Sequence, residues 1–276
     1  MKGRLLIIGG HEDREDDMAV LERFVELAGG PGSRIAVITA ASKVGEKLWE
    51  VYDAAFAALG VENRRAIHIE DRAEAEDPEL AADVAQADGI FMTGGEQRRL
   101  IAMVNGTALD AAMHAALERG ACVAGTSAGA SAMSARMLAH GRSELTPEKG
   151  TVAVGEGFGF LPGVIVDQHF SERHRLARLL TVVAQNHELI GIGIDEDTAL
   201  LIEAGNAIEV IGSGTVTIVD GRSMLSNVAA VAPGAVPQML DVRLHILPSG
   251  TRHSIGDADS QPDSLADFLS IATRIG

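Results

Sequence analysis

The sequence contains very little cysteine and few aromatic residues. A single cysteine, Cys122, occurs among 276 residues, so no intrachain disulfide can form, which suits a reducing compartment. Cys122 lies in an apolar run and is expected to be a small buried hydrophobic residue. Aromatic residues make up 3% of the chain against 46% hydrophobic residues, so Ala, Val, Ile and Leu must build the core. This composition is typical of parallel sheets covered by helices.

Basic residues are also scarce. The chain has 23 Lys and Arg against 39 Asp and Glu, a formal net charge of −16. Such a charge disfavours nucleic acid and anionic membranes as partners. The apolar run in "MKGRLLIIGGHEDRED" is too short for a secretory signal, and no apolar stretch is long enough to cross a bilayer. We therefore expect a cytoplasmic protein.

Short strands and helices alternate through the first half of the chain. The apolar runs predict strands over residues 4–10, 34–40, 65–69, 89–95 and 121–127. Helical periodicity lies between them, over residues 17–30, 46–60 and 77–87, with one or two helices over 96–120. This alternation predicts an α/β fold, a mostly parallel sheet with helices on both faces.

The pattern changes after residue 140. A strand and loop are expected over 163–170, then a helix over 171–186 with Ser171 as its N-cap. Residues 189–221 read as short strands separated by turn signals, which predicts an antiparallel edge of the sheet.

The end of the chain contains few regular elements. Residues 242–250 can form one more strand, and residues 254–264 are polar and loop-like. No repeat or linker divides the sequence. We therefore predict a single α/β catalytic domain over 1–276, with residues 251–276 as a peripheral tail.

Three glycine-containing loops follow predicted strands. They are "GGHED" (9–13), "TGGEQ" (93–97) and "GTSAG" (125–129). The carboxyl ends of parallel strands meet at one edge of a sheet, where ligands bind. We therefore expect these loops to converge on one site.

The third loop places Ser127 between Gly125 and Gly129 in a G-x-S-x-G pattern. A nucleophile elbow holds a serine on a strained strand-to-helix turn, which requires small neighbours. The helix N-terminus then favours negative charge beside the hydroxyl. A plain strand-to-helix corner in a glycine-rich chain is the alternative. Ser131 and Ser134, further along the helix, are predicted to be packing residues.

A serine nucleophile needs a base and an orienting carboxylate. His169 comes just past the buried strand in "VIVDQHF", and His174 is its nearest competitor. The remaining histidines are expected to be structural; they are His11, His68, His114, His140, His187, His245 and His253. For the carboxylate, "GIGIDEDTAL" offers three acidic residues, which an acidic hairpin turn explains as well; they are Asp195, Glu196 and Asp197.

Other groups near these loops can contact a substrate. The backbone N–H groups of Gly95 and Ala128 can form an oxyanion hole. Gln97 can hydrogen-bond a substrate amide or carboxylate, or it can face water in the first turn of a helix. The arginines after His169 can grip carboxylates or form an exposed basic helix face; they are Arg173, Arg175 and Arg178.

Four blocks of sequence together resemble one known family. They are "FMTGGEQRRL", "GTSAGASAMS", "VDQHFSERHRLARL" and "GIGIDEDTAL", and with "IIGGHED" they cover most of residues 4–200. Their order and spacing resemble the cyanophycinases, in the serine peptidase group that also contains α-aspartyl dipeptidase. The resemblance is weaker after residue 205.

The resemblance implies a class I glutamine-amidotransferase-like fold that carries a serine nucleophile. Ser127 is then the nucleophile, His169 the base and Glu196 the orienting carboxylate. Matches to positions associated with substrate recognition are Gln97, Asp167, Gln168, Arg173, Arg175 and Arg178. The family hydrolyses cyanophycin, a polyaspartate whose side-chain carboxyls carry arginine, and releases β-Asp-Arg dipeptides. A homodimer is implied too, and we expect no metal or cofactor.

Alternative functions remain at this point. An α-aspartyl or isoaspartyl dipeptidase belongs to the same group, and a non-catalytic binding protein can keep the fold. An amidotransferase is disfavoured because serine replaces the cysteine nucleophile. The acidic run "HEDREDD" (11–17) is interpreted as a surface that attracts the guanidinium groups of the polymer, or else as a solvated loop.

Overall fold

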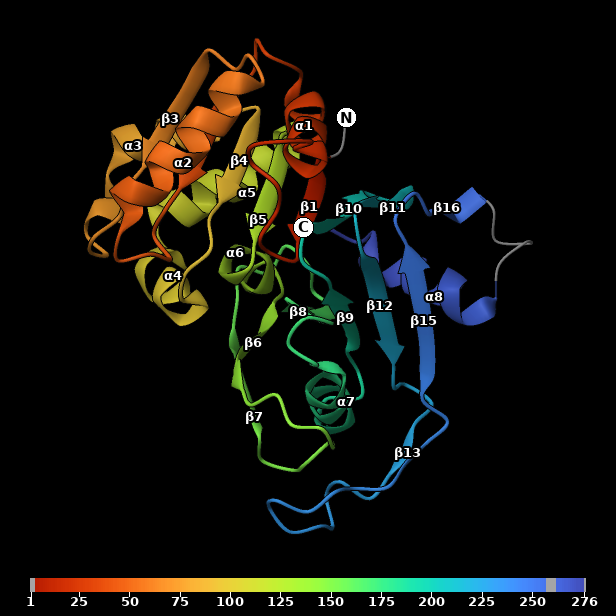
Figure 1. Cartoon of the computed structure of the whole chain (residues 1–276). Coiled ribbons are helices and arrows are strands. Elements are labelled where there is room, and N and C mark those ends of the chain that lie inside the picture. Colours follow the sequence, from red (N-terminus) through yellow and green to blue (C-terminus); the bar gives the residue numbers. More distant parts are fainter. Residues whose placement is uncertain (1–2, 257–261, 276) are drawn as a thin grey trace.

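Parallel strands form the centre of an eight-stranded sheet (Figure 1). The computed structural model describes residues 3–256 and 262–275. The strand order is β16-β11-β10-β1-β5-β4-β2-β3. The parallel strands are β1 (Arg4–Ile8), β2 (Arg34–Ile38), β3 (Asn63–Ile67), β4 (Gly89–Met92) and β5 (Cys122–Thr126). Every residue of β4 and β5 is buried, as expected where helices cover both faces.

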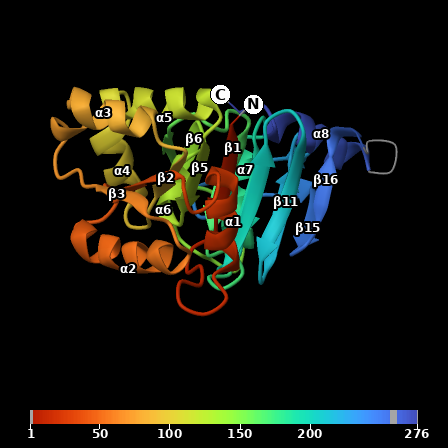
Figure 2. The same cartoon turned by 90° about the horizontal axis from the view of Figure 1, so that it is seen from above.

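Helices cover both faces of this sheet (Figure 2). Alternate residues of β1 show why, because Leu6 packs in a cluster with Phe24 of α1, while Leu5 lies in a different cluster with Met113 of α5. The helices of this half are α1 (Ala19–Ala28), α2 (Gly45–Ala58), the short 3₁₀ helix η1 (Glu74–Glu76), α3 (Pro78–Ala85), α4 (Gln97–Val104) and α5 (Ala108–Arg119). The predicted α/β fold with a mostly parallel sheet is confirmed.

The second half of the chain contributes to two sheets. Three strands extend the main sheet in antiparallel fashion beyond β1; they are β10 (Thr198–Glu203), β11 (Ala207–Gly212) and β16 (Arg252–Ser254). A separate sheet contains β8 (Val164–Gln168), β9 (Ile190–Ile194), β12 (Thr215–Asp220) and β15 (Arg243–Pro248). The single antiparallel edge predicted for residues 189–221 is therefore wrong, because strands of that stretch divide between the two sheets.

Two small ribbons were not predicted from the sequence. One joins β6 (Arg136–Gly141) to β7 (Val152–Glu156), and the other joins β13 (Leu225–Ser226) to β14 (Met239–Leu240). The first follows directly on α6 (Ala128–Ala132), which is only one turn long.

The helix predicted over residues 171–186 begins later than expected. α7 spans Leu176–Gln185, with Arg175 as its N-cap. Ser171 is not the N-cap, because the helix begins only at Leu176, and the Ser171 backbone N–H donates to Asp195 Oδ1 at 3.0 Å instead. Positive φ angles of 47° at His169 and 52° at His174 keep the intervening residues out of a helix.

The predicted peripheral tail contributes to the core instead. β16 pairs with β11, and α8 (Asp263–Ala272) buries Leu265, Phe268 and Leu269 in the main hydrophobic cluster. The apolar residues of α8 follow helical spacing, and this face is covered by the body of the protein. Residues 257–261, part of the loop predicted over 254–264, lie outside the described residues.

Among the described residues, no single helix is long and apolar enough to cross a membrane. The helices α4 and α5 reach that length and apolarity only as a pair, and the chain bends by 97° between them.

Candidate active site

Ser127 lies on a strained turn between β5 and α6. Its φ and ψ angles are 52° and −108°, a conformation that non-glycine residues rarely adopt. A Cβ atom at Gly125 would clash with the backbone of Gly129, and one at Gly129 would clash with the carbonyl oxygen of Met92. The small residues on each side of the serine are therefore required by close packing, as the pattern predicted.

The end of β1 holds three site loops together. The carbonyl oxygens of Ile8, Gly9 and Gly10 each accept a hydrogen bond from a backbone N–H in one of the loops that follow β5, β8 and β9. Ser127 donates to Ile8 at 3.0 Å, His169 to Gly9 at 2.8 Å, and Asp197 to Gly10 at 2.8 Å. A Cβ at Gly10 would overlap the His169 ring, so the glycine allows that ring to approach.

These backbone anchors bring Ser127, His169 and Glu196 into one chain of hydrogen bonds. Ser127 Oγ is 2.9 Å from His169 Nε2, and His169 Nδ1 is 2.6 Å from Glu196 Oε1. The His169 side chain is buried, while Glu196 keeps partial contact with solvent. The arrangement can transfer a proton from the hydroxyl to a ring that the carboxylate orients.

The two other acidic residues of the "DED" segment have structural partners. Asp195 accepts from the backbone N–H of Ser171 and from both N–H and Oγ of Thr215. Asp197 accepts from the backbone N–H of Asp13. The hairpin-turn interpretation therefore describes Asp195 and Asp197, whereas Glu196 alone of the three meets the histidine.

The remaining histidines lie elsewhere, with one exception. His174 lines a groove beside α7 and is not among the partners of Ser127 or Glu196. His68 contacts Thr39, and His114 contacts the carbonyl oxygen of Phe158. The exception is His11, whose Nδ1 is 3.0 Å from Glu196 Oε2 and whose ring lies edge-on to His169 with centroids 5.0 Å apart.

The sequence-based assignment of His11 as a structural residue is therefore incomplete. The signal that could have found it was its position in the "GGHED" loop, which was expected to converge on the site. Together, His11, His169 and Glu196 also form the group of nitrogen and carboxylate ligands in the described part of the chain that could hold a metal ion.

Burial and charge affect the two titrating members of the chain in different ways. Burial lowers the pKa of His169 below its ordinary 6.5, although the hydrogen bond to Glu196 opposes this shift. Burial alone would raise the pKa of Glu196, but its hydrogen bonds and charge interactions with His169 and His11 outweigh it and lower that pKa. A neutral imidazole beside an ionised carboxylate is the state that a general base requires.

The acidic loop before α1 is only partly a charged surface. Glu12 is buried, and its carboxylate accepts from Tyr52 and, at 2.6 Å, from Thr126 Oγ1, one residue before Ser127. The prediction that Glu12 is a surface charge is wrong, because its carboxylate is buried and binds Thr126 next to the elbow.

Asp13 also has a structural role in this loop. Its carboxylate accepts from several successive backbone N–H groups, among them that of Met18, and these hydrogen bonds lower its pKa strongly. Glu15, Asp16 and Asp17 remain exposed, so only they can serve as a charged surface.

The "TGGEQ" loop lies against the elbow. A Cβ at Gly94 would come within 3.4 Å of Ser127 Cβ, and the positive φ of Gly95 lets its backbone pass close to Ala41. Among the described residues, the N–H groups of Gly95 and Ala128 have no hydrogen-bond acceptor. Both therefore remain available as the predicted oxyanion donors.

The side-chain amide of Gln97 makes hydrogen bonds within the protein. Gln97 Nε2 donates to the carbonyl oxygens of Leu138 and Ala139 at 3.2 and 3.3 Å, which connects α4 to β6. Its amide oxygen remains as the group that can meet a substrate.

Asp167 is the centre of a buried ion-pair network. It is 1% exposed and accepts from Arg178 Nε at 2.8 Å, from Arg178 Nη2 and from Arg175 Nη1. Arg175 Nη1 also contacts the carbonyl and side-chain oxygens of Gln168. Burial lowers the pKa of Arg175 to about 10, although Asp167 opposes the shift.

The exposed basic helix face considered above is therefore wrong for Arg175 and Arg178, which are buried, whereas Arg173 is exposed. Each guanidinium nitrogen of Arg178 donates a hydrogen bond, because Nε and Nη2 donate to Asp167 and Nη1 donates to the carbonyl oxygen of Gly141. Asp167 and Arg178 thus hold β8 and the turn after His169 in place, whereas the side chain of Arg173 is exposed to solvent.

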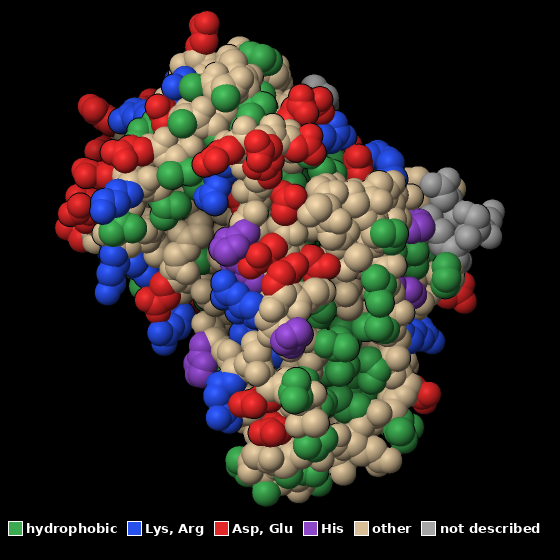
Figure 3. Space-filling view, viewed as in Figure 1, with side chains coloured by type: hydrophobic (Ala, Val, Ile, Leu, Met, Phe, Trp, Pro, Cys, Tyr) green, Lys and Arg blue, Asp and Glu red, His purple; other side chains and the backbone are tan. Residues whose placement is uncertain are grey.

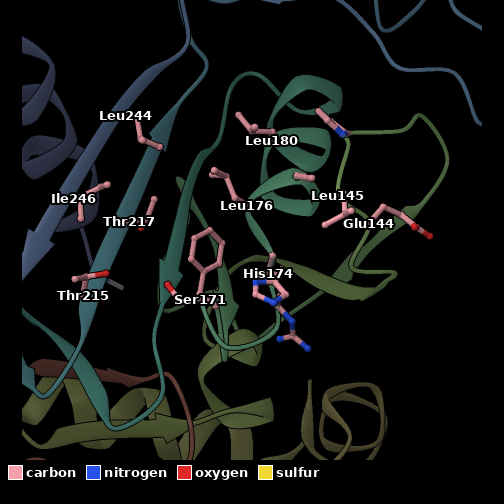
Figure 4. A pocket seen from close by; sticks show the side chains of 14 residues that line it. Glu144, Leu145, Ser171, His174, Leu176, Leu180, Thr215, Thr217, Leu244 and Ile246 are labelled. Atoms are coloured by element: carbon pink, nitrogen blue, oxygen red, sulfur yellow. The ribbon is translucent and has the colours of Figure 1, made fainter.

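An open groove of about 540 Å³ lies beside this turn (Figure 4). Leu244 and Ile246 of β15 lie across from Leu176 and Leu180 of α7, and His174 lies at one end. Ser127 and Glu196 do not line this groove. Figure 3 shows apolar side chains gathered over the same part of the molecule.

Comparison with known proteins assigns the chain to a family. The family model described as peptidase family S51 matches residues 5–210, a range that includes Ser127, His169 and Glu196. The chain belongs to peptidase family S51.

Relatives within the family match nearly the whole chain. A cyanophycinase of Geminocystis herdmanii is 39% identical over 256 residues, which cover 92% of this chain and 94% of the relative. A cyanophycinase of Trichormus variabilis is 36% identical, with 91% and 85% of the two chains covered. The crystal structure of a peptidase from an acI-B1 actinobacterium superposes with a TM-score of 0.67 at 24% identity, over 92% of this chain and 97% of that one, and supports the fold.

Proposed function

We propose that this S51 peptidase hydrolyses cyanophycin to β-Asp-Arg dipeptides through a covalent acyl-enzyme. The observation that carries the proposal is the hydrogen-bonded series Ser127–His169–Glu196 on a strained elbow. The substrate is supported by the cyanophycinase relatives at 36–39% identity over most of the chain.

The chemistry follows the geometry of the site. His169 Nε2 accepts the proton of Ser127 as the hydroxyl attacks an aspartate backbone carbonyl. Glu196 keeps the remaining ring proton on Nδ1 and stabilises the imidazolium. The N–H groups of Gly95 and Ala128 bind the oxyanion, His169 returns the proton to the leaving amine, and water then hydrolyses the ester.

Product analysis tests the proposal. The protein is incubated with cyanophycin and, separately, with the dipeptide Asp-Leu, and the products are identified by mass spectrometry. β-Asp-Arg from cyanophycin with no cleavage of Asp-Leu is the expected result. Cleavage of Asp-Leu alone would assign the chain to α-aspartyl dipeptidases, and no covalent labelling of Ser127 by an active-site serine probe would favour the non-catalytic binding protein.

The pH dependence of activity should reflect the lowered pKa of His169. The neutral ring is the active form, so kcat/KM is expected to be constant above that pKa and to fall about tenfold per pH unit below it. Burial lowers the pKa, as do Arg173 and His11, whereas Glu196 raises it, with a net shift below 6.5. Measuring kcat/KM from about pH 4 to 9 checks this pH dependence, with EDTA present to keep metal ions away from the histidine. An acid midpoint above 6.5 would contradict the assignment.

The exposed part of the acidic loop should assist binding of the polymer. Glu15, Asp16 and Asp17 are exposed on an acidic protein, and Figure 3 shows acidic side chains near histidines on this face. Replacing all three by amides should raise KM for cyanophycin about two- to fivefold, leave kcat unchanged and reduce the salt dependence of KM. A matched triple amide variant at Glu50, Glu62 and Glu79, which are exposed elsewhere, serves as control. Equal KM values for the two variants would show that the loop is merely solvated.

The homodimer and the cytoplasmic location remain predictions. The homodimer is supported by an exposed, apolar edge strand, since Leu244 and Ile246 of β15 face solvent at the edge of the four-stranded sheet.

A further inference from the structure

Three potential metal ligands converge at the outer side of the catalytic site. His11 Nδ1 is 3.0 Å from one oxygen of Glu196, and His169 Nδ1 is 2.6 Å from the other. The donor atoms of the three residues all lie within 4.8 Å of one another. Two imidazoles therefore each direct a nitrogen at a different oxygen of the same carboxylate.

This donor set suits zinc. Two histidine nitrogens and a carboxylate form a common Zn²⁺ site, with bonds of about 2.0–2.2 Å. Ligand atoms on a tetrahedron with such bonds are about 3.4 Å apart, and the nitrogen–oxygen contacts of 2.6 and 3.0 Å need only a small expansion to reach this. A cation bound here would take one oxygen of Glu196 and one nitrogen of each imidazole.

His11 is accessible and held in place. Its side chain is 66% exposed, so a hydrated cation can reach it from solvent. The neighbouring residues fix the loop, because Glu12 is buried against Thr126 and Asp13 N–H donates to Asp197. A ligand on an anchored loop loses little conformational freedom when it binds a metal.

We propose that His11, His169 and Glu196 bind one Zn²⁺ ion and that this ion reversibly inhibits the peptidase. Zinc takes the lone pair of His169 Nδ1, so the single proton of the neutral ring must lie on Nε2. Nε2 then donates rather than accepts, and it cannot remove the Ser127 proton. The ion is an inhibitor and not a cofactor. Its inhibitory effect rests on the proposed serine chemistry, whereas its binding does not.

Calorimetric titration tests binding without any activity readout. The full-length chain is freed of metal with EDTA, dialysed and titrated with zinc chloride at about pH 8, because metal binding competes with protons for the ligands. Wild type and Ser127→Ala should each bind one zinc ion with similar affinity. His11→Ala should bind zinc at least about tenfold more weakly. Removing a residue that only hydrogen-bonds a metal ligand already lowers metal affinity by about 10- to 100-fold, and removing the ligand itself should lower it at least as much. His174→Ala, which removes an exposed histidine of the neighbouring turn, should bind as wild type does.

Inhibition is measured next, with each variant compared with its own rate in EDTA. Zinc should inhibit the wild type and His174→Ala equally, EDTA should restore both, and His11→Ala should require at least about tenfold more zinc. Equal zinc affinity of wild type and His11→Ala would overturn the site. Zinc binding that depends on His11 without any loss of activity would overturn the inhibitory role. A wild type that binds zinc but never cleaves cyanophycin would contradict the proposed function and leave the metal site supported.

Discussion

Replacing Ser127 by alanine is expected to lower kcat for cyanophycin by about 10⁴- to 10⁶-fold. The variant loses the only hydroxyl within hydrogen-bond distance of His169 Nε2 among the described residues. Without it, no acyl-enzyme can form, and only oxyanion binding and substrate positioning remain. The fold should persist, since alanine occupies the same strained turn with no added atoms. Single-turnover assays with mass spectrometry of β-Asp-Arg measure the loss, and circular dichroism checks the fold.

Ser134→Ala provides the matched control for this experiment. Ser134 is fully buried near α6, and within the described residues its hydroxyl has no hydrogen-bond partner. Removing that hydroxyl should leave kcat within about twofold of wild type, because an unsatisfied buried polar group stabilises nothing. Cleavage by Ser127→Ala at the rate of this control would refute the assignment of the nucleophile.

Replacing Asp167 by alanine is expected to destabilise the protein by about 3–5 kcal/mol. The substitution would leave the guanidinium groups of Arg175 and Arg178, 7% and 6% exposed, without their carboxylate in the protein interior. The thermal unfolding midpoint should fall by roughly 10 °C for a chain of this size. Activity should fall as well, since these ion pairs hold the turn that follows His169.

An exposed ion pair gives the comparison for Asp167→Ala. Arg136 and Glu188 contact at 2.7 Å with side chains 50% and 55% exposed, so Glu188→Ala should cost no more than about 1 kcal/mol. Unfolding in urea measures both variants. If Asp167→Ala kept the stability of the Glu188→Ala variant but lost activity, Asp167 would act on the substrate and not as the centre of a structural network.

The sequence predicted the central features of the site because they are local. The elbow at Ser127 depends on residues within two positions of it, and the glycines there prevent clashes with Gly129 and Met92. His169 was distinguished from other histidines by its place after a buried strand. The choice of Glu196 came from the resemblance to a family, because the local sequence does not distinguish which of the three acidic residues in that segment orients the histidine.

The errors concern burial and long-range contacts. Glu12 looked like one charge in an acidic run, but it contacts Thr126, which lies 114 residues further along the chain. His11 looked structural, but it meets Glu196 across 185 residues. Arg175 and Arg178 were predicted either to grip carboxylates of a substrate or to form an exposed helix face, because no local pattern shows that they pair with the buried Asp167.

By itself, the sequence determined the alternation of strands and helices, the mostly parallel sheet and the strained bend at Ser127. Each of these depends on side-chain period and on steric limits among neighbouring residues, which a linear string contains. Tertiary structure alone decided that His11 joins the site, that α8 belongs to the core, and that the end of β1 holds three separate loops through its carbonyl oxygens. Those outcomes depend on which distant segments pack together, and such packing is a property of the whole folded chain.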